Sequence, residues 1–406
     1  MTYVNRRKLL MTAASAAATL TAPSIVRAED TTGITATEIK IGATSPQSGP
    51  VSLLGVIARL HEAYFKMINE KGGIAGRKIN FIYYDDGFQP PKTVEKVRQL
   101  IESDEVAFLF GCVGTAPMTA VANYTNGRKV PNLFMTLNGD KWGEYQKYPM
   151  MMGFATSART ESQIYTKYAL QQLPKAKFGI LYQNDDFGKD YVAGVRDVLG
   201  ADFDARAVAV PHEVADPTLD SQLVKLKAAG VDVLISGTTA KFVAQSLKKV
   251  SELDWKPTHF IANGAISVKD VINPVGGDRV VGILSSATQK DPSDPMWDND
   301  PGMMEYRAFM KNYLPQRSAE NTQDLYAYTV VLAIMQVLKQ CGTNLSRENI
   351  MRQAENLKDV ELATLLPGIK VNTSPTNHRP IKQMQLQRWD GTVWKRFGPI
   401  IEGSDT

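Results

Sequence analysis

Hydroxyl-bearing residues follow two strand-like segments in the first third of the chain. Residues 111–115 (GCVGT) place Thr115 at the start of a predicted helix, and residues 136–139 (TLNG) place Thr136 and Asn138 directly after an apolar segment. Hydroxyl groups and the free N–H groups of a helix N-terminus bind carboxylates without a reactive side chain. The structural alternative is that Thr115 and Thr136 serve only as helix N-caps.

Three more polar loops follow strand-like segments later in the chain, at residues 183–188 (QNDDFG), 237–240 (GTTA) and 263–265 (NGA). Loops at the carboxyl ends of parallel strands share one edge of a sheet, where open α/β sheets bind ligands. Two such sets of loops that face each other form a cleft that closes on a small molecule. The pattern therefore favours reversible binding of a small anion.

Motifs for catalysis or metal binding are absent from the sequence. The four histidines form no H-E-x-x-H and no pair at metal-ligand spacing, and no G-x-S-x-G, P-loop or G-x-G-x-x-G motif occurs. Cys112 and Cys341 are the two cysteines, with no C-x-x-C, so a disulfide framework is excluded. One bridge between them is conceivable in an oxidising compartment; we expect both to be free. We predict no enzyme activity, no catalytic residue, no metal and no cofactor.

Short apolar runs alternate with helical patterns through most of the chain, which predicts an α/β fold with parallel sheets covered on both faces. At 406 residues, the chain is long enough for two doubly wound lobes. Residues 56–71 have helical apolar spacing and end at Gly72-Gly73. Strands are expected at 39–43, 79–84, 107–110, 132–135, 178–182, 231–236 and 259–262. The helices are expected at 93–102, 116–126, 158–173, 188–199, 218–229 and 240–253.

The pattern changes after residue 283. An acidic, proline-rich loop at 291–301 precedes helical stretches at 302–313 and 321–340. Strand-like segments at 384–389 and 393–397 are joined by Asp390-Gly391, which predicts a hairpin.

Residues 1–28 have the composition of a cleaved signal peptide. Residues 1–8 are basic, residues 9–21 are small or apolar, and residues 26–28 (VRA) fit a cleavage site, so cleavage is expected near Ala28. The alternative is a membrane anchor, but a span needs about 20 apolar residues. Residues 5–10 (NRRKLL) resemble a twin-arginine motif, so the export route stays open. We expect a periplasmic protein.

Removal of this segment changes the charge balance. It contains four of the 46 basic residues and no acid, so 42 basic residues remain against 42 acidic ones. A chain without net charge has no electrostatic preference for nucleic acid or an anionic membrane surface. We expect neither as a partner.

Several motifs resemble those of periplasmic solute-binding proteins of the branched-chain amino acid (leucine/isoleucine/valine) type, which serve ABC importers. They follow the family's order over residues 38–335. The motifs are IGA at 41–43, SGP at 48–50, Gly55, NxxGGIxG at 69–76, YDD at 84–86, GxVGT at 111–115, FG at 187–188 and AGVD at 229–232.

The resemblance implies the type I periplasmic-binding-protein fold, with two lobes joined by a hinge of three segments. Lobe 1 would comprise residues 38–156 and 287–372, and lobe 2 residues 157–286 and 373–402. The implied function is that of an extracytoplasmic receptor which delivers a small carboxylate-bearing ligand to a membrane permease, as a monomer. The alternative is a periplasmic sensor that reports its ligand to a transmembrane receptor.

The resemblance also implies ligand-binding positions in both lobes. Those of lobe 1 include hydroxyl and amide residues that hold the ligand's carboxylate and amino groups. Those of lobe 2 include an aromatic residue before a glycine and the loop after the strand at 259–262. Carried over residue by residue, they fall on Leu54, Thr115, Thr136, Asn138, Phe187, Thr239, Asn263, Gly264 and Tyr328.

The sequence departs from the family in two respects, of which the first concerns the ligand. The leucine-binding members carry a Glu in the loop after the strand at 259–262, where it pairs with the ligand's ammonium, but residues 263–266 here are NGAI. Burying the ligand's ammonium without a carboxylate costs several kcal/mol. Because about 1.4 kcal/mol corresponds to a tenfold change in affinity, this cost would remove several orders of magnitude of affinity. Either another acid substitutes, or the ligand is an aromatic or apolar carboxylic acid without an ammonium, which we favour slightly over an amino acid. The acids considered are Asp140, Asp185, Asp186 and Asp324.

The second departure concerns a disulfide of lobe 1. The resemblance places it between the loop after Asp86 and the Gly114 region, but Phe88 and Gly114 occupy those positions. Lobe 1 must therefore be stabilised there by other contacts.

Overall fold

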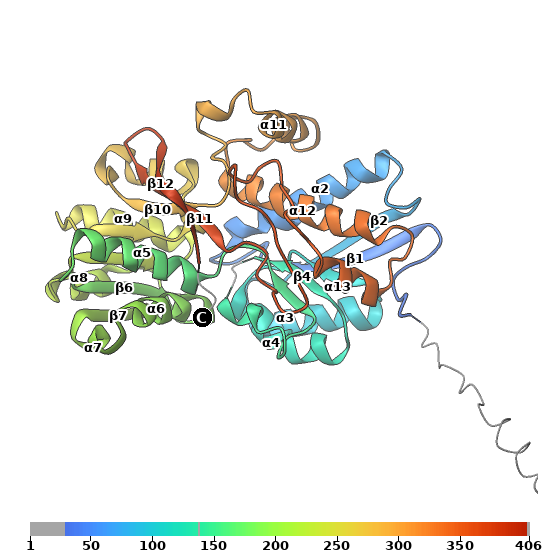
Figure 1. Cartoon of the computed structure of the whole chain (residues 1–406), viewed down its shortest axis with the longest axis horizontal. Helices are drawn as coiled ribbons and strands as arrows, with labels where there is room; N and C mark the ends of the chain where they lie inside the picture. The colour runs from blue at the N-terminus through green and yellow to red at the C-terminus, as the bar shows by residue number, and fades with distance from the viewer. Residues whose placement is uncertain (1–28, 137–138, 404–406) are drawn as a thin grey trace, which may run out of the picture. The chain divides into compact units, whose positions relative to one another are not determined.

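The computed structural model describes residues 29–136 and 139–403 and contains two sheets within one compact unit (Figure 1). The first sheet has the order β2-β1-β3-β4-β5, and all its pairs are parallel. Its strands are β1 (Glu38–Ser45), β2 (Lys78–Asp85), β3 (Phe108–Phe110), β4 (Asn132–Met135) and β5 (Met151–Gly153). The predicted signal peptide lies outside the described residues.

The second sheet has the order β12-β11-β10-β9-β8-β6-β7. Strands β6 to β10 pair in parallel, whereas β11 is antiparallel to both β10 and β12, so the expected parallel lobe has an antiparallel edge. The predicted hairpin is confirmed, with Trp389 opposite Trp394. The strands are β6 (Phe178–Gln183), β7 (Ala207–His212), β8 (Val233–Gly237), β9 (Thr258–Ile261), β10 (Leu284–Ala287), β11 (Gln383–Trp389) and β12 (Trp394–Glu402).

Helices cover both faces of each sheet, because the strands bury side chains on both sides. In β3, Phe108 and Phe110 enter one hydrophobic cluster and Leu109 the opposite one. In β6, Ile180 and Leu181 likewise enter two different hydrophobic clusters, one on each face of the sheet. The helices are α2 (Val56–Glu70), α3 (Pro90–Arg98), α4 (Thr115–Gly127), α5 (Ala158–Gln172), α6 (Asp186–Leu199), α7 (Phe203–Arg206), α8 (Asp220–Ala228), α9 (Ala240–Glu252), α10 (Asn273–Val275), α11 (Pro301–Tyr313), α12 (Thr322–Cys341) and α13 (Arg347–Ala354).

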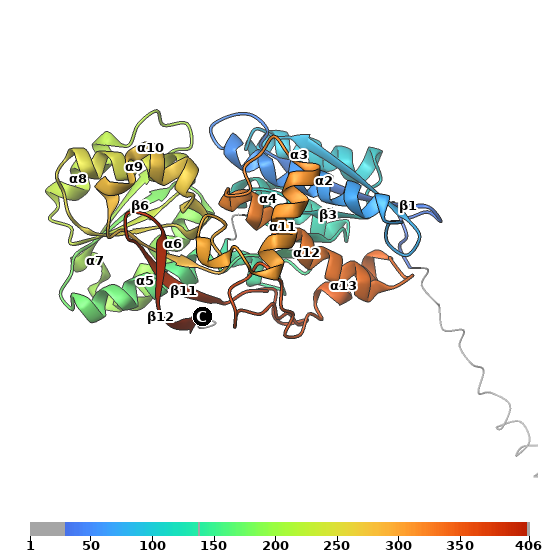
Figure 2. The same cartoon turned by 90° about the horizontal axis from the view of Figure 1, so that it is seen from above.

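The chain passes between the two sheets three times, after β5, after β10 and after α13. The last passage brings β11 and β12 beside α5 of the second lobe, as both views show (Figures 1 and 2). These passages are the three segments of the expected hinge. The residue boundaries of the lobes given above stay a prediction.

The position of the implied disulfide in lobe 1 is occupied by an aromatic contact. Phe88 is buried, and a Cβ on Gly114 would lie 2.5 Å from its ring, so only a glycine allows this approach. Gly114 also has a φ of 106°, which side chains with a Cβ rarely adopt. The thiols of Cys112 and Cys341 are free and buried, in separate hydrophobic clusters.

Candidate ligand-binding cavity

A cavity of about 90 Å³ lies between the two lobes. Two of the three hinge segments line it, through Ala155 and Thr156 in the first and Thr288 and Gln289 in the second. Six of the predicted site residues also line it: Leu54, Thr136, Phe187, Thr239, Asn263 and Gly264.

Four helices begin at the cavity, and each contributes lining residues from its first turn. These residues are Ala158 of α5, Phe187 of α6, Ala240 of α9, and Thr322 and Gln323 of α12. Each helix N-terminus carries a partial positive charge and N–H groups that lack helical acceptors. Their convergence makes this end of the cavity favourable for an anion.

The start of α9 differs from the starts of the other three helices. Ser157, Asp185 and Asn321 cap α5, α6 and α12 with their side chains. At α9, the side chain of Thr239 makes no capping hydrogen bond to the described helix. Thr239 and Ala240, the first residue of α9, both line the cavity.

Three hydroxyl groups in the wall form no hydrogen bond of good geometry with the described protein residues. These groups are Thr136 Oγ1, Thr322 Oγ1 and Tyr326 OH. All three oxygen atoms are buried, and none of them is in a well-formed hydrogen bond to residues 29–136 or 139–403. Burial raises the pKa of Tyr326, an effect that the neighbouring Thr136 hydroxyl partly offsets. Buried polar groups are nearly always satisfied, so unpaired hydroxyls around a cavity indicate a polar ligand.

The cavity also contains a carboxyl group that the sequence analysis missed. Glu161 on α5 is 2% exposed and lines the cavity. Its carboxylate accepts hydrogen bonds from the backbone N–H of Asn263 at 2.8 Å, from the Tyr191 hydroxyl at 2.9 Å and from the Tyr165 hydroxyl. Burial raises the pKa of Glu161 to about 7, against the opposing effect of these donors.

A sequence signal for Glu161 existed. It shares one face of α5 with Tyr165 and Ala169, at spacings of four residues, and both of these are buried. An acid on the buried face of a helix is unusual and marks a functional or paired group. The loop that lacks the expected Glu therefore still contacts a carboxylate, through the backbone of Asn263.

The four acids considered as substitutes have partners elsewhere and do not line the cavity. Asp185 caps α6 through the N–H of Gly188 at 3.0 Å. Asp324 forms an ion pair with Arg317 at 2.7 Å. Asp140 and Asp186 take part in contacts between the lobes, described below.

Two predicted site residues that the structure describes, Thr115 and Tyr328, do not line the cavity. Thr115 is buried, and its hydroxyl accepts a hydrogen bond from the N–H of Gly139 at 3.2 Å, so it holds the loop after β4. Tyr328 is 2% exposed and packs against Tyr64, Tyr306 and Phe309 in the core of lobe 1. Asn138 lies outside the described residues.

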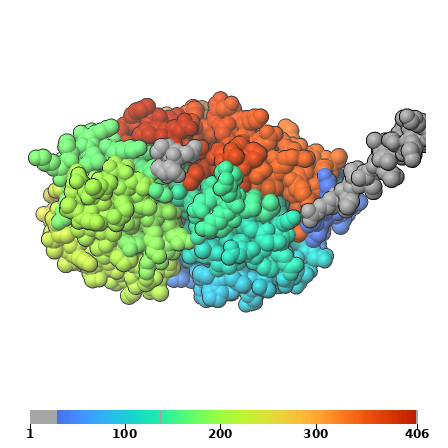
Figure 3. Space-filling view, turned by 60° about the horizontal axis from the view of Figure 1, so that its bottom comes forward, coloured from blue at the N-terminus to red at the C-terminus, as the bar shows by residue number. Residues whose placement is uncertain are grey.

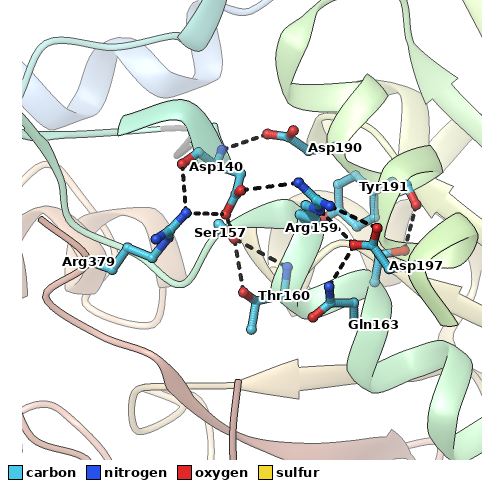
Figure 4. Close-up of polar contacts among 10 residues, drawn as sticks. Asp140, Ser157, Arg159, Thr160, Gln163, Asp190, Tyr191, Asp197 and Arg379 are labelled. Atoms are coloured by element: carbon cyan, nitrogen blue, oxygen red, sulfur yellow. Dashed lines mark hydrogen bonds and ion pairs between the residues drawn. The ribbon is translucent and has the colours of Figure 1, made fainter. Parts of the chain in front are cut away.

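Polar residues from both lobes contact one another beside the hinge (Figure 4). We call these residues the interlobe polar cluster: Asp140, Ser157, Arg159, Asp190 and Arg379. The backbone N–H of Asp140 donates to Asp190 Oδ2 at 2.7 Å. The carboxylate of Asp140 accepts from Ser157 Oγ at 2.8 Å and pairs with Arg379 at 3.1 Å and Arg159 at 3.8 Å. Burial raises the pKa of Asp190 to about 7.

The interlobe polar cluster lies where surfaces of the two lobes meet. Helix α4 of lobe 1 packs against α6 of lobe 2, and the teal surface of lobe 1 adjoins the green surface of lobe 2 (Figure 3). Contacts of this kind stabilise one relative arrangement of the lobes.

A groove of about 290 Å³ adjoins the cavity and shares Leu54, Thr239, Ala240 and Gln323 with it. Basic residues from both lobes line the groove: Arg59, Lys241, Lys269 and Arg317. Arg317 forms an ion pair with Asp324, which neutralises its charge. Asp270 also lines the groove, but the three remaining basic residues outnumber this single acid. The groove therefore attracts anions towards the cavity.

The histidines of the chain lie in the protein interior. The four histidines are buried, and burial lowers the pKa of His61 and His259 to about 3. Within residues 29–136 and 139–403, no three His, Cys, Asp or Glu side chains gather in a way that could hold a metal ion. No helix among these residues combines the length and hydropathy of a membrane span.

Comparisons with known proteins agree with this geometry. The family model described as Periplasmic binding protein matches residues 38–393. Leu/Ile/Val-binding protein homolog 7 of Brucella suis biovar 1 (strain 1330) is 24% identical over 394 residues, which cover 90% of this chain and 93% of that protein.

Solved structures show the same fold at low sequence identity. The branched chain amino acid ABC transporter structure from Thermus thermophilus with bound valine has a TM-score of 0.79 and 15% identity, and the match covers 91% of this chain and 97% of that one. The fatty acid ABC transporter substrate-binding protein from Thermomonospora curvata has a TM-score of 0.75 and 16% identity, with 92% and 95% covered. The chain belongs to the periplasmic binding protein family, with its two-lobed type I fold, and resembles the Leu/Ile/Val-binding proteins of ABC transport.

Proposed function

We propose that the mature protein is the periplasmic receptor of an ABC importer of the branched-chain amino acid or amide type. It captures a small carboxylate-bearing ligand in the cavity between its lobes and delivers it to the membrane permease. It acts as a monomer and leaves the ligand chemically unchanged.

The observation that carries this proposal is the convergence of four helix N-termini and three unpaired buried hydroxyls on one cavity. Together they offer N–H and O–H donors to a carboxylate, while Leu54, Phe187 and Ile266 supply apolar wall for its body. Valine and fatty acids, named for two similar structures, both carry a carboxylate.

A calorimetric and thermal-shift screen of the mature protein tests ligand binding. The panel contains amino acids, short-chain acids, aromatic acids and the corresponding amides, and binding to the folded state raises the melting temperature. At least one carboxylate is expected to bind, and mass spectrometry is expected to recover it unchanged. If no carboxylate binds, or if the bound ligand is converted, the proposal is wrong.

Transport and sensing are separated by uptake measurements. Deletion of the gene is expected to abolish uptake of the identified ligand, and the wild-type gene is expected to restore it. A sensor would leave uptake intact when the permease is expressed from an independent promoter.

A further inference from the structure

Glu161 is a buried carboxyl group whose protein contacts supply no positive charge. Its hydrogen-bond donors are the Tyr165 and Tyr191 hydroxyls and the N–H of Asn263. Among the described residues that line the cavity with it, none is Lys, Arg or His. The basic residues of the adjoining groove line a different wall.

This arrangement leaves the charge of Glu161 unbalanced when the cavity is empty. A carboxylate offers about four acceptor positions, and three are used by these donors. Ionisation of a buried carboxyl is costly without an opposite charge, although its hydrogen bonds reduce the cost. A cation in the cavity would complete the site, because Glu161 borders that space.

Resting on the function proposed above, we propose that Glu161 determines specificity by binding an ammonium group of the ligand. The ligand is then an amino-bearing acid, with its carboxylate at the helix N-termini and its ammonium at Glu161. This proposal narrows the ligand class to acids that carry an ammonium, the alternative that the sequence analysis favoured slightly less.

The surroundings of Glu161 hold its carboxylate in place. Tyr191 packs on Gly237, where a Cβ would lie 2.5 Å from the Tyr191 ring, so the glycine allows this position of the hydroxyl. Tyr165 also contacts Ser286 Oγ at 3.0 Å on β10. A fixed carboxylate binds a cation with little loss of side-chain entropy.

The titratable groups that face Glu161 are few. Tyr165 on α5 and Tyr191 on α6 contact it directly, and burial keeps the pKa of both well above their usual range. The loop after β9 contributes only the backbone N–H of Asn263. Strand β10 contacts Tyr165 through the hydroxyl of Ser286, which does not titrate in this range. Asp190 lies beyond Tyr191 and raises the pKa of that tyrosine. Between pH 5.5 and 8.5, the direct contacts of Glu161 therefore keep their protonation.

Matched ligand pairs test this proposal. Calorimetry compares L-leucine with 4-methylpentanoic acid, and L-valine with 3-methylbutanoic acid, at pH 5.5, 7.0 and 8.5. Each pair differs only in the amino group. We expect the amino acid to bind at least tenfold more tightly at pH 8.5, and its affinity to rise with pH as Glu161 ionises. The acid without an amino group should lose affinity over the same range, because the ionised Glu161 repels it.

The variant Glu161→Gln keeps the shape of the side chain and removes its charge. It should weaken binding of the amino acid at least tenfold at pH 8.5, flatten the pH dependence, and leave binding of the matched acid unchanged or tighter. Glu252→Gln, an exposed acid on α9 outside the cavity, is the control and should behave as wild type. The pH comparison on wild-type protein needs no variant, so it holds even if Glu161→Gln folds poorly.

The outcomes separate this inference from the proposed function. If the acids without an amino group bind as tightly as the amino acids at pH 8.5, or affinity for the amino acids falls with pH, Glu161 does not bind an ammonium. The receptor function would then stand with a different ligand class. If neither class binds wild-type protein and the wider carboxylate panel also fails, the proposed function itself fails.

Discussion

The ammonium of Lys141 lies 2.8 Å from the carboxylate of Asp186, which joins a short helix of lobe 1 to the first residue of α6 in lobe 2. Thr119 of α4 donates to the same carboxylate at 3.0 Å. The contact adds to the interlobe polar cluster on one side of the cavity. Both lobes must approach closely for it to form.

Lys141→Met should therefore weaken ligand binding without changing the cavity wall. The Asp186 side chain is 41% exposed, so the ion pair contributes at most about 1 kcal/mol, which corresponds to a fall in affinity of about five-fold or less. Calorimetry in 20 mM and 500 mM NaCl measures it, and the difference from wild type should shrink at high salt. Lys225→Met, at an exposed lysine of α8, is the control. Equal affinities of Lys141→Met and wild type at low salt would show that this ion pair does not support closure.

Glu161 and Asp190 contribute a stability that declines as pH rises, opposite in sign to the contribution of the buried His61 and His259. The folded-state pKa of Glu161 and of Asp190 is about 7 in both cases, above the usual values of 4.5 and 3.8. At these two acids the folded protein therefore binds protons more tightly than the unfolded chain, so their contribution to stability is highest below the unfolded pKa and falls until pH passes about 7. At about 1.4 kcal/mol per pKa unit, the loss at Glu161 is up to about 3 kcal/mol.

Denaturant unfolding of the ligand-free protein between pH 4.5 and 8.5 measures this decline. Asp190→Asn keeps an acceptor for the N–H of Asp140 and should flatten the curve by at least about 1 kcal/mol. Glu252→Gln, at an exposed acid outside these clusters, serves as the control. An Asp190→Asn curve that runs parallel to the wild-type curve over this pH range would contradict the burial of the Asp190 charge.

Thr136→Val should separate ligand binding from folding. The hydroxyl of Thr136 has no satisfactory partner among the described residues, so its loss should leave the unfolding free energy unchanged or raise it by up to about 1 kcal/mol. If the hydroxyl binds the ligand, affinity falls about three- to tenfold, the equivalent of one hydrogen bond.

Thr115→Val is the matched comparison for Thr136→Val. This variant should lower stability more than it lowers ligand affinity. The hydroxyl of Thr115 accepts from the N–H of Gly139, so the unfolding free energy should fall by about 1 kcal/mol, with a smaller effect on affinity. Calorimetry and denaturant unfolding of both variants decide the matter. A larger loss of affinity in Thr115→Val than in Thr136→Val would return Thr115 to the site.

Two tyrosines of α12 provide a test of which helix face meets the ligand. Tyr326 lines the cavity with an unpaired hydroxyl, whereas Tyr328 packs in the core of lobe 1. Tyr326→Phe should lower ligand affinity about three- to tenfold with no loss of stability. Tyr328→Phe should leave affinity within twofold of wild type. The opposite ranking of the two affinities would favour Tyr328 as the ligand-binding residue.

Periodicity in the sequence predicted most elements of the fold correctly. The spacing of Ile57, Leu60 and Tyr64 identified α2, and the apolar run at 178–182 identified β6, because burial of one face imposes its period on the chain. The motifs of residues 38–335 indicated the family, and its fold is confirmed. Strands β5, β7 and β10 were missed because β5 has three residues, β7 contains Pro211 and β10 contains two buried serines.

Tertiary structure alone decided which polar residues share the cavity. Glu161 and Asn263 are 102 residues apart and meet because α5 and β9 pack in one lobe. Tyr326 and Tyr328 are two residues apart on one helix but lie about 200° apart around its axis, so they face different surroundings. The local sequence pattern of a segment indicates which of its faces is buried. It does not indicate which distant segment supplies the partner, because a contact depends on the direction of both side chains after the lobes have folded.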